Sequence, residues 1–209
     1  TLATRKYNVL VTGLLNAAEK PAVEAFLAEG GGVLVCNPRS YPREADFTLT
    51  CEWLAGLGAR PRWELLQDTA AENVVRDVMG CALSFSDLIA PAVNEGVTGV
   101  LTLTGTSSTG WEPPMSYDLS ADWRTLVRGA ATMHTRHEMR NDLVLQPWLT
   151  TTEIPASPPL LAAREAGKGR LAVCAIRDYW LFTPPPNCPT AEAMLTAGAG
   201  GKPSQWLRV

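Results

Sequence analysis

Long apolar runs are absent from this sequence of 209 residues. No stretch approaches the roughly 18–20 consecutive apolar residues that a membrane-spanning helix requires. The opening TLATRKYNVL also lacks the apolar segment of a secretory signal peptide. No extended basic stripe occurs, because 18 lysines and arginines are interspersed with 21 acidic residues, for a net charge of −3. We therefore expect a soluble, cytoplasmic protein whose partners include neither nucleic acid nor a membrane.

The residue patterns of metal sites, disulfide frameworks and nucleotide sites are missing too. The five cysteines are odd in number and have no CxxC spacing, which predicts thiols in a reducing compartment. The two histidines occur in HTRHE, without the HExxH spacing of a zinc site. The glycine phrases GGG and GKG match neither a Walker loop nor a dinucleotide fingerprint. We expect no metal and no cofactor.

The first third of the chain alternates between strand and helix patterns. A β-rich run precedes a segment with apolar residues at helical spacing, then three glycines and a short apolar run without alternation. A proline-punctuated loop, a second helix and a third strand follow. The expected elements are strand Tyr7–Val11, helix Asn16–Glu29, strand Val33–Val35, a helix from Phe47 to Leu57, and strand Arg62–Leu66. This order predicts a flavodoxin-like, doubly wound α/β fold with a mostly parallel sheet and helices on both faces.

The remainder predicts antiparallel β additions to that sheet. Val97–Thr109 suggests a strand followed by a turn, Trp111–Asp122 a loop, and Gly167–Gly169 a tight hairpin turn. Further strand-like segments are Thr125–Thr132, Asp142–Leu145, Leu160–Arg164 and Arg170–Ile176. We expect one domain over residues 1–209, truncated at one or both ends.

Three stretches carry a family resemblance: YNVLVTG, VEAFLAEGGGVLVCNP and PLLAAREAGKGRLAVCAIRD. Together they resemble the class I glutamine amidotransferase-like superfamily, in particular its divergent members related to trehalose-utilisation proteins. The resemblance implies that Cys36 stands at the nucleophile position, and that the strand after GKGR ends where the family carries His-x-Glu.

The sequence departs from that family at both catalytic positions. In place of Gly-x-Cys-x-Gly, Cys36 is flanked by Val35, Asn37 and Pro38, and a proline has no N–H to offer an oxyanion. In place of His-x-Glu, the last strand ends with Ile176-Arg177-Asp178. These departures predict a member without the usual Cys-His-Glu triad.

Candidate catalytic residues remain if a histidine approaches Cys36 from elsewhere in the chain. His134 or His137 would then act as the base, with Glu138 beside His137. The alternative is that Cys36 is a buried small hydrophobe at a strand end, and that both histidines lie in a solvated turn. The sequence leaves both open.

A second set of candidates follows the predicted strand ends, where ligands bind in open α/β sheets. Arginines and an acid there would bind a carboxylate or sugar hydroxyls, and a tryptophan in a loop would stack on a carbohydrate. The predicted ligand-binding residues are Asn37, Arg39, Arg43, Arg177, Asp178 and Trp180.

Three functions follow from these residues. The first is a non-catalytic amidotransferase-like domain that serves as a binding or assembly module of a larger protein, with a carbohydrate, a protein partner or further domains of the parent chain as its ligand. The second is a cysteine-dependent hydrolase or amidotransferase that uses Cys36 with His134 or His137. The third is a carbohydrate-active hydrolase or isomerase that works through Asp178, Glu138 and the arginines.

Overall fold

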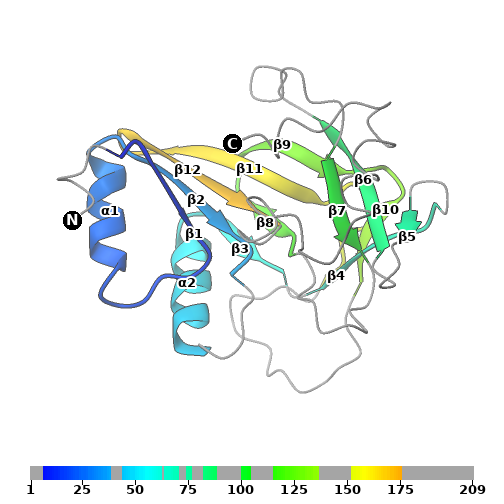
Figure 1. Ribbon diagram of the computed structural model, residues 1–209, viewed down its shortest axis with the longest axis horizontal. Helices are drawn as coiled ribbons and strands as arrows, with labels where there is room; N and C mark the ends of the chain where they lie inside the picture. The colour runs from blue at the N-terminus through cyan, green and yellow to red at the C-terminus, as the bar shows by residue number, and fades with distance from the viewer. Residues whose placement is uncertain are drawn as a thin grey trace.

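A computed structural model describes residues 7–38, 44–62, 64–70, 74–76, 82–88, 100–104, 115–136 and 152–175. The described elements form a mixed α/β fold (Figure 1). The helices are α1 (Lys20–Ala28) and α2 (Glu44–Gly56). The strands are β1 (Val9–Thr12), β2 (Gly32–Cys36), β3 (Ala59–Pro61), β4 (Leu65–Asp68), β5 (Val74–Arg76), β6 (Ala82–Leu88), β7 (Val100–Thr104), β8 (Tyr117–Leu119), β9 (Arg124–Gly129), β10 (Met133–Arg136), β11 (Pro159–Ala166) and β12 (Gly169–Cys174). Neither described helix has both the length and the apolar character needed to cross a membrane.

The main sheet combines parallel and antiparallel pairs. Its order in the described part is β1-β2-β12-β11-β9-β6-β5, and β7 also pairs with β6. Strands β1, β2 and β12 run parallel, whereas the other pairs are antiparallel. Two smaller sheets join β10 to β4 and β3 to β8. The predicted antiparallel additions are therefore confirmed, although the strand beside β2 comes from the far end of the described chain.

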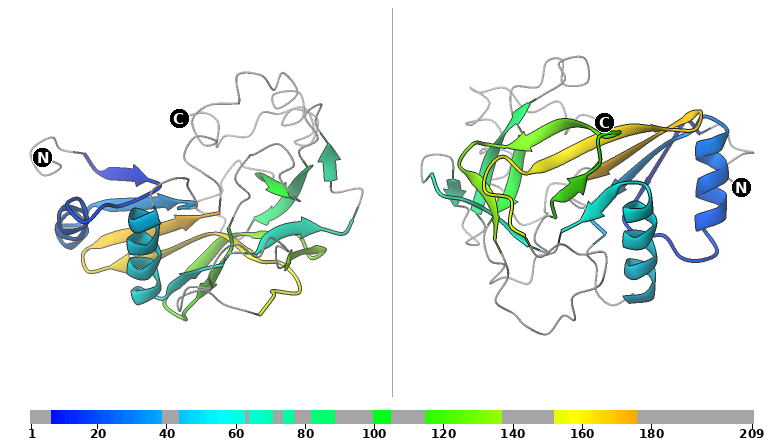
Figure 2. Two further views of the ribbon diagram at one scale, coloured as in Figure 1. Left: turned by 90° about the horizontal axis from the view of Figure 1, so that it is seen from below. Right: turned by 180° about the vertical axis from the view of Figure 1, so that it is seen from behind.

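Both helices cover the same face of the parallel part of the sheet (Figure 2). Val33 and Val35 of β2 and Leu171 and Val173 of β12 point to that face, since alternate residues of a strand share a side. They form one cluster with three buried residues of α1 and two of α2: Val23, Phe26, Leu27, Trp53 and Leu54. The expected placement of helices on both faces is thus not what the described residues show.

The third predicted strand, Arg62–Leu66, is wrong. Strand β3 ends at Pro61 and β4 begins at Leu65, so Arg62 and Glu64 lie in the connection between them. Strand β3 pairs antiparallel with β8 in a separate sheet, and β4 pairs with β10. The chain therefore leaves the main sheet after β2 and does not add a third parallel strand next in sequence.

The other local predictions are mostly confirmed, with shifted ends. Helix α1 starts at Lys20, because Asn16 Oδ1 accepts hydrogen bonds at 2.9 Å from the N–H groups of Ala18 and Glu19 in a preceding turn. The β11–β12 hairpin turns at Gly167, whose φ of 64° suits the first position of a two-residue loop. The predicted Trp111–Asp122 loop contains strand β8, while Asp142–Leu145 lies outside the described residues.

Candidate functional site at the ends of β2 and β12

Cys36 is the last residue of β2 and is fully buried, with 0% of its surface exposed. Its neighbour across the parallel pair is Cys174, the last residue of β12, which is also buried. Both side chains belong to one apolar cluster on the face opposite the helices. Both residues, together with buried Cys51 of α2, are thiols and not disulfides. The nucleophile position suggested by the family resemblance is therefore enclosed.

The segment from Met115 to Tyr117 packs against the ends of these strands. The Met115 N–H donates to the Ala175 carbonyl at 3.1 Å, and the Tyr117 hydroxyl donates to the Cys174 carbonyl at 3.1 Å. The Ser116 hydroxyl donates to the Pro159 carbonyl at 2.9 Å. All three residues of the segment are buried. The protein's own chain thus occupies the carboxyl end of β12, next to the place where a ligand was expected.

Burial dominates the electrostatics around these strand ends. It raises the pKa of the Tyr117 hydroxyl well above its usual range, and interactions with Cys174, Cys51 and Cys36 raise it further. The pKa of the Cys51 thiol is also raised, first by burial and then by the negative charge of Glu52. Both groups therefore stay protonated at neutral pH. A raised pKa is the opposite of what an activated nucleophile requires.

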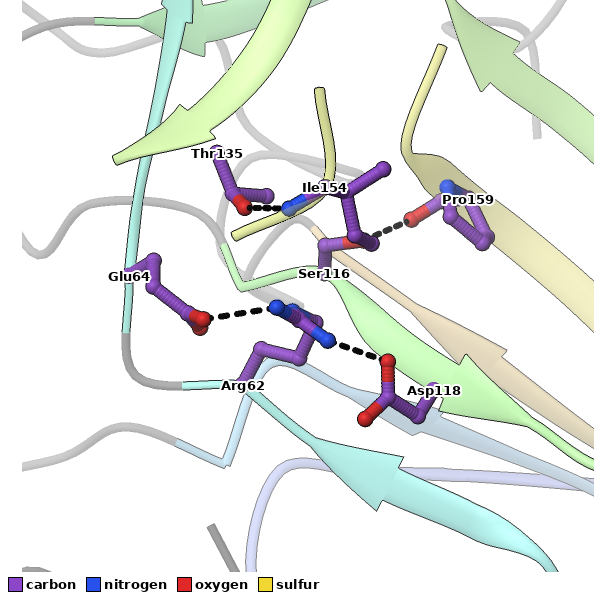
Figure 3. A network of polar contacts seen from close by, with 7 residues as sticks. All are labelled: Arg62, Glu64, Ser116, Asp118, Thr135, Ile154 and Pro159. Carbon is purple, nitrogen blue, oxygen red and sulfur yellow. Dashed lines mark hydrogen bonds and ion pairs between the residues drawn. The ribbon is translucent and has the colours of Figure 1, made fainter. Parts of the chain in front are cut away.

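Beside this segment lies a buried network of charged residues (Figure 3). Arg62 donates to Glu64 Oε1 at 2.8 Å and also to the carboxylate of Asp118 on β8. The side chains of Arg62 and Glu64 are only 2% and 1% exposed, whereas that of Asp118 is 41% exposed. The Arg62 N–H continues the β3–β8 pairing by donating to the Ser116 carbonyl at 2.9 Å. This network fixes the connection between β3 and β4 to the segment that covers the strand ends.

The structure places the other predicted site residues as follows. His134 is in strand β10, not in the expected solvated turn, and the preceding Met133 packs in the same cluster as Cys36. Because neighbouring residues of a strand point to opposite faces, His134 points away from that cluster. Asn37 is buried directly after β2. The remaining candidates lie outside the described residues: Arg39, Arg43, His137, Glu138, Arg177, Asp178 and Trp180. Among the described residues, no group of three or more metal-ligating side chains could hold an ion.

The glycine phrases of the family resemblance form a packing joint. Gly30, with a φ of 106°, and Gly31 end α1 by donating to the carbonyls of Leu27 at 3.0 Å and Phe26 at 2.9 Å. The Gly31 carbonyl in turn accepts the N–H of Arg170 at 3.1 Å. A β-carbon at Gly169 would lie 2.4 Å from the carbonyl oxygens of both Gly31 and Leu27. The two phrases therefore let the end of α1 contact the β11–β12 hairpin.

Trp123, a loop tryptophan of the kind predicted to stack on carbohydrate, packs inward. It is buried in the cluster under the helices, and its indole N–H donates to the Leu57 carbonyl at 2.9 Å. The Arg164 guanidinium donates to the same carbonyl at 2.7 Å and lies 6.0 Å from the centre of the Trp123 ring. Trp123 thus covers the end of α2 and presents no stacking surface.

No family model matches the chain, and no curated protein matches it. Solved structures do. The mmIFT52 N-terminal domain matches with a TM-score of 0.56 at 14% identity, over 100% of this chain and 79% of that one. A cytoplasmic protein, STM3548, from Salmonella typhimurium has a TM-score of 0.43 at 14% identity, over 88% of this chain and 67% of that one. A ThuA-like protein from Bacteroides uniformis has a TM-score of 0.35 at 14% identity, over 84% and 62%.

These likenesses concern the fold alone. The first shows that the chain shares the fold of an N-terminal domain of another protein. The third is a ThuA-like protein, the group to which the sequence was expected to be related. A TM-score of 0.35 is too low to show a shared fold. Membership of the amidotransferase-like superfamily therefore stays a prediction.

Sequence reasoning missed the residues that cover the strand ends. Tyr117 lies in a stretch dense in proline, serine and aspartate, which predicted a surface loop. Arg62 and Glu64 flank a tryptophan in what was expected to be a strand. The available signal was the pair of opposite charges at Arg62 and Glu64, next to Pro61. In a buried segment such charges must neutralise each other, which would have indicated an ion pair.

Proposed function

We propose that this chain is a non-catalytic binding or assembly module of a larger protein. The observation that carries the proposal is the complete burial of Cys36 in an apolar cluster. A nucleophile needs a reacting atom within a few ångströms and a positioned base, whereas the face of β2 that carries Cys36 packs against apolar side chains. The likeness to the mmIFT52 N-terminal domain supports a modular role.

Thiol labelling tests the non-catalytic part of this proposal. With iodoacetamide at neutral pH, we expect native Cys36 to react at least about 100-fold more slowly than in urea, because labelling requires the core to open. An Ala25→Cys variant supplies an exposed reference, since Ala25 lies on the exposed surface of α1. Labelling is read by mass spectrometry of peptides. If native Cys36 reacts faster than the reference thiol, with a rate already constant below pH 7, it is an activated nucleophile and the proposal fails.

The edge of the sheet at β1 supports the assembly part of the proposal. In the described residues β1 pairs only with β2. Its sequence, VLVT, contains no proline and no charged residue that would discourage pairing with a further strand. Tyr7 and Val9 are the exposed large hydrophobics of the described part. In an antiparallel pair of two copies centred on Leu10, Val9 would lie opposite Val11 and Leu10 opposite itself. We propose that a second copy pairs there.

Self-association should therefore depend on Val9. We expect the weight-average mass in sedimentation equilibrium to rise with protein concentration for the wild type, and Val9→Lys to abolish this rise, because the charge lies opposite Val11, next to the centre of the strand pair. Ala25→Lys adds the same charge to the exposed surface of α1 and serves as the matched control. Association that is absent in the wild type, or unchanged by Val9→Lys, would show that β1 is not the contact.

A further inference from the structure

Cys36 and Cys174 end two neighbouring parallel strands at the same level of the sheet. The register pairs Val35 with Val173 and then Cys36 with Cys174. Residues directly opposite each other in a parallel pair point to the same side, and both cysteines lie in the same buried cluster. The two thiols therefore stand next to each other, although the residues are far apart in the sequence.

The backbone separation of this pair suits a covalent bond between the sulfurs. Neighbouring strands lie about 4.7–4.9 Å apart, and disulfides join residues whose Cα atoms are about 4.4–6.8 Å apart. Each cysteine is the last residue of its strand, so the β2–β12 pairing continues on only one side of the pair. Cys51, the other buried thiol of the described part, belongs to α2 and is not part of this strand pair.

We propose that Cys36 and Cys174 form an oxidation-sensitive dithiol that closes to a disulfide in the presence of a peroxide. We place the attack on hydrogen peroxide at the Cys174 sulfur, because Cys174 is 5% exposed whereas Cys36 is 0% exposed. The O–O bond breaks, Cys174 becomes a sulfenic acid, and the second oxygen leaves as water. The Cys36 sulfur then attacks the Cys174 sulfur, the S–O bond breaks, and the hydroxyl leaves as water with the Cys36 proton. Two thiols and one peroxide thus give one disulfide and two waters.

The bond would join the two strand ends that the Tyr117 segment covers. The Tyr117 hydroxyl donates a hydrogen bond to the Cys174 carbonyl. A disulfide would therefore link β2 covalently to the residue that holds this segment. A cross-link between residues this distant in sequence restricts the unfolded chain strongly. We therefore expect the oxidised protein to unfold at a higher urea concentration than the reduced one, and dithiothreitol to reverse the shift.

Peptide mapping under non-reducing conditions tests this proposal. After treatment with hydrogen peroxide and alkylation, we expect one linked peptide that contains Cys36 and Cys174, with the loss of two thiols. Cys51→Ser is the matched control and should give the same link, whereas Cys36→Ser and Cys174→Ser should not. The wild-type map is decisive even if a variant fails to fold. A link to another cysteine, or intact Cys36 and Cys174 under conditions that oxidise the exposed thiol of Ala25→Cys, would overturn the proposal.

Discussion

Replacement of Arg62 with alanine is expected to lower the free energy of unfolding by about 3–5 kcal/mol, the usual cost of removing one partner of a buried ion pair. Arg62 is 2% exposed and Glu64 is 1% exposed, so the variant would leave the Glu64 carboxylate in the interior without its guanidinium. The same change removes the side-chain contact to Asp118 and opens a cavity between β3, β4 and β8. Urea unfolding followed by tryptophan fluorescence measures the loss.

Arg60→Ala is the matched control for this experiment. Arg60 is on β3, two residues before Arg62, and is opposite Asp118 in the register, but it is exposed. Ion pairs at the surface contribute about 0–1 kcal/mol, so Arg60→Ala should change stability by less than about 1 kcal/mol. Equal losses in the two variants would contradict a special role for burial at Arg62.

A double variant separates charge from packing. Arg62→Met with Glu64→Leu removes both buried charges and keeps most of the side-chain volume. Such replacements are often neutral or stabilising, because the desolvation of two charges is expensive. We therefore expect the double variant to be more stable than Arg62→Ala. If it is equally destabilised, the loss comes from the hydrogen bonds and shape of the network, and the buried charge of Glu64 is not its main cause.

The local elements of the first third were predictable because their signals are local. Helix α1 has buried residues at i, i+3 and i+4, a proline near its start and glycines at its end, and β2 is an uninterrupted apolar run. The pairing of β2 was not predictable in the same way. An apolar strand pattern does not say which strand it pairs with. Only long-range packing decides that β12, and not the strand that follows α2, lies beside β2.

The position of the candidate site was predictable from the sequence, but its chemical surroundings were not. The sequence located Cys36 at a strand end and left open whether it would be buried or reactive. Residues of distant strands decide its surroundings: Leu66 of β4, Met133 of β10 and Leu161 of β11 share its buried cluster, and no local pattern around Cys36 indicates them. The glycine phrases correctly indicate a close backbone contact. They do not indicate its role, because such contacts occur in packing joints as well as in catalytic turns.

Gly169→Ala is expected to be the second strongly destabilising change, at about 3 kcal/mol. The new β-carbon would lie 2.4 Å from two carbonyl oxygens and 3.0 Å from the Cα of Leu27. All three are backbone atoms, so no side chain can rotate away, and relief requires α1 to shift from β12. Overpacking of a fixed site costs about 1–3 kcal/mol, with backbone clashes at the upper end. The φ of Gly169 is not positive, so the effect is steric.

Gly56→Ala provides the contrast. Gly56 is the last residue of α2, and no atom lies within 4 Å of the β-carbon position. Alanine there reduces the conformational freedom of the unfolded chain at no steric cost, so we expect a gain of up to about 1 kcal/mol. Urea unfolding of both variants measures the difference. If Gly169→Ala were as stable as the wild type, α1 and the β11–β12 hairpin could not be in the close contact that the two glycine phrases create, and Arg170 could not reach the Gly31 carbonyl as it does here.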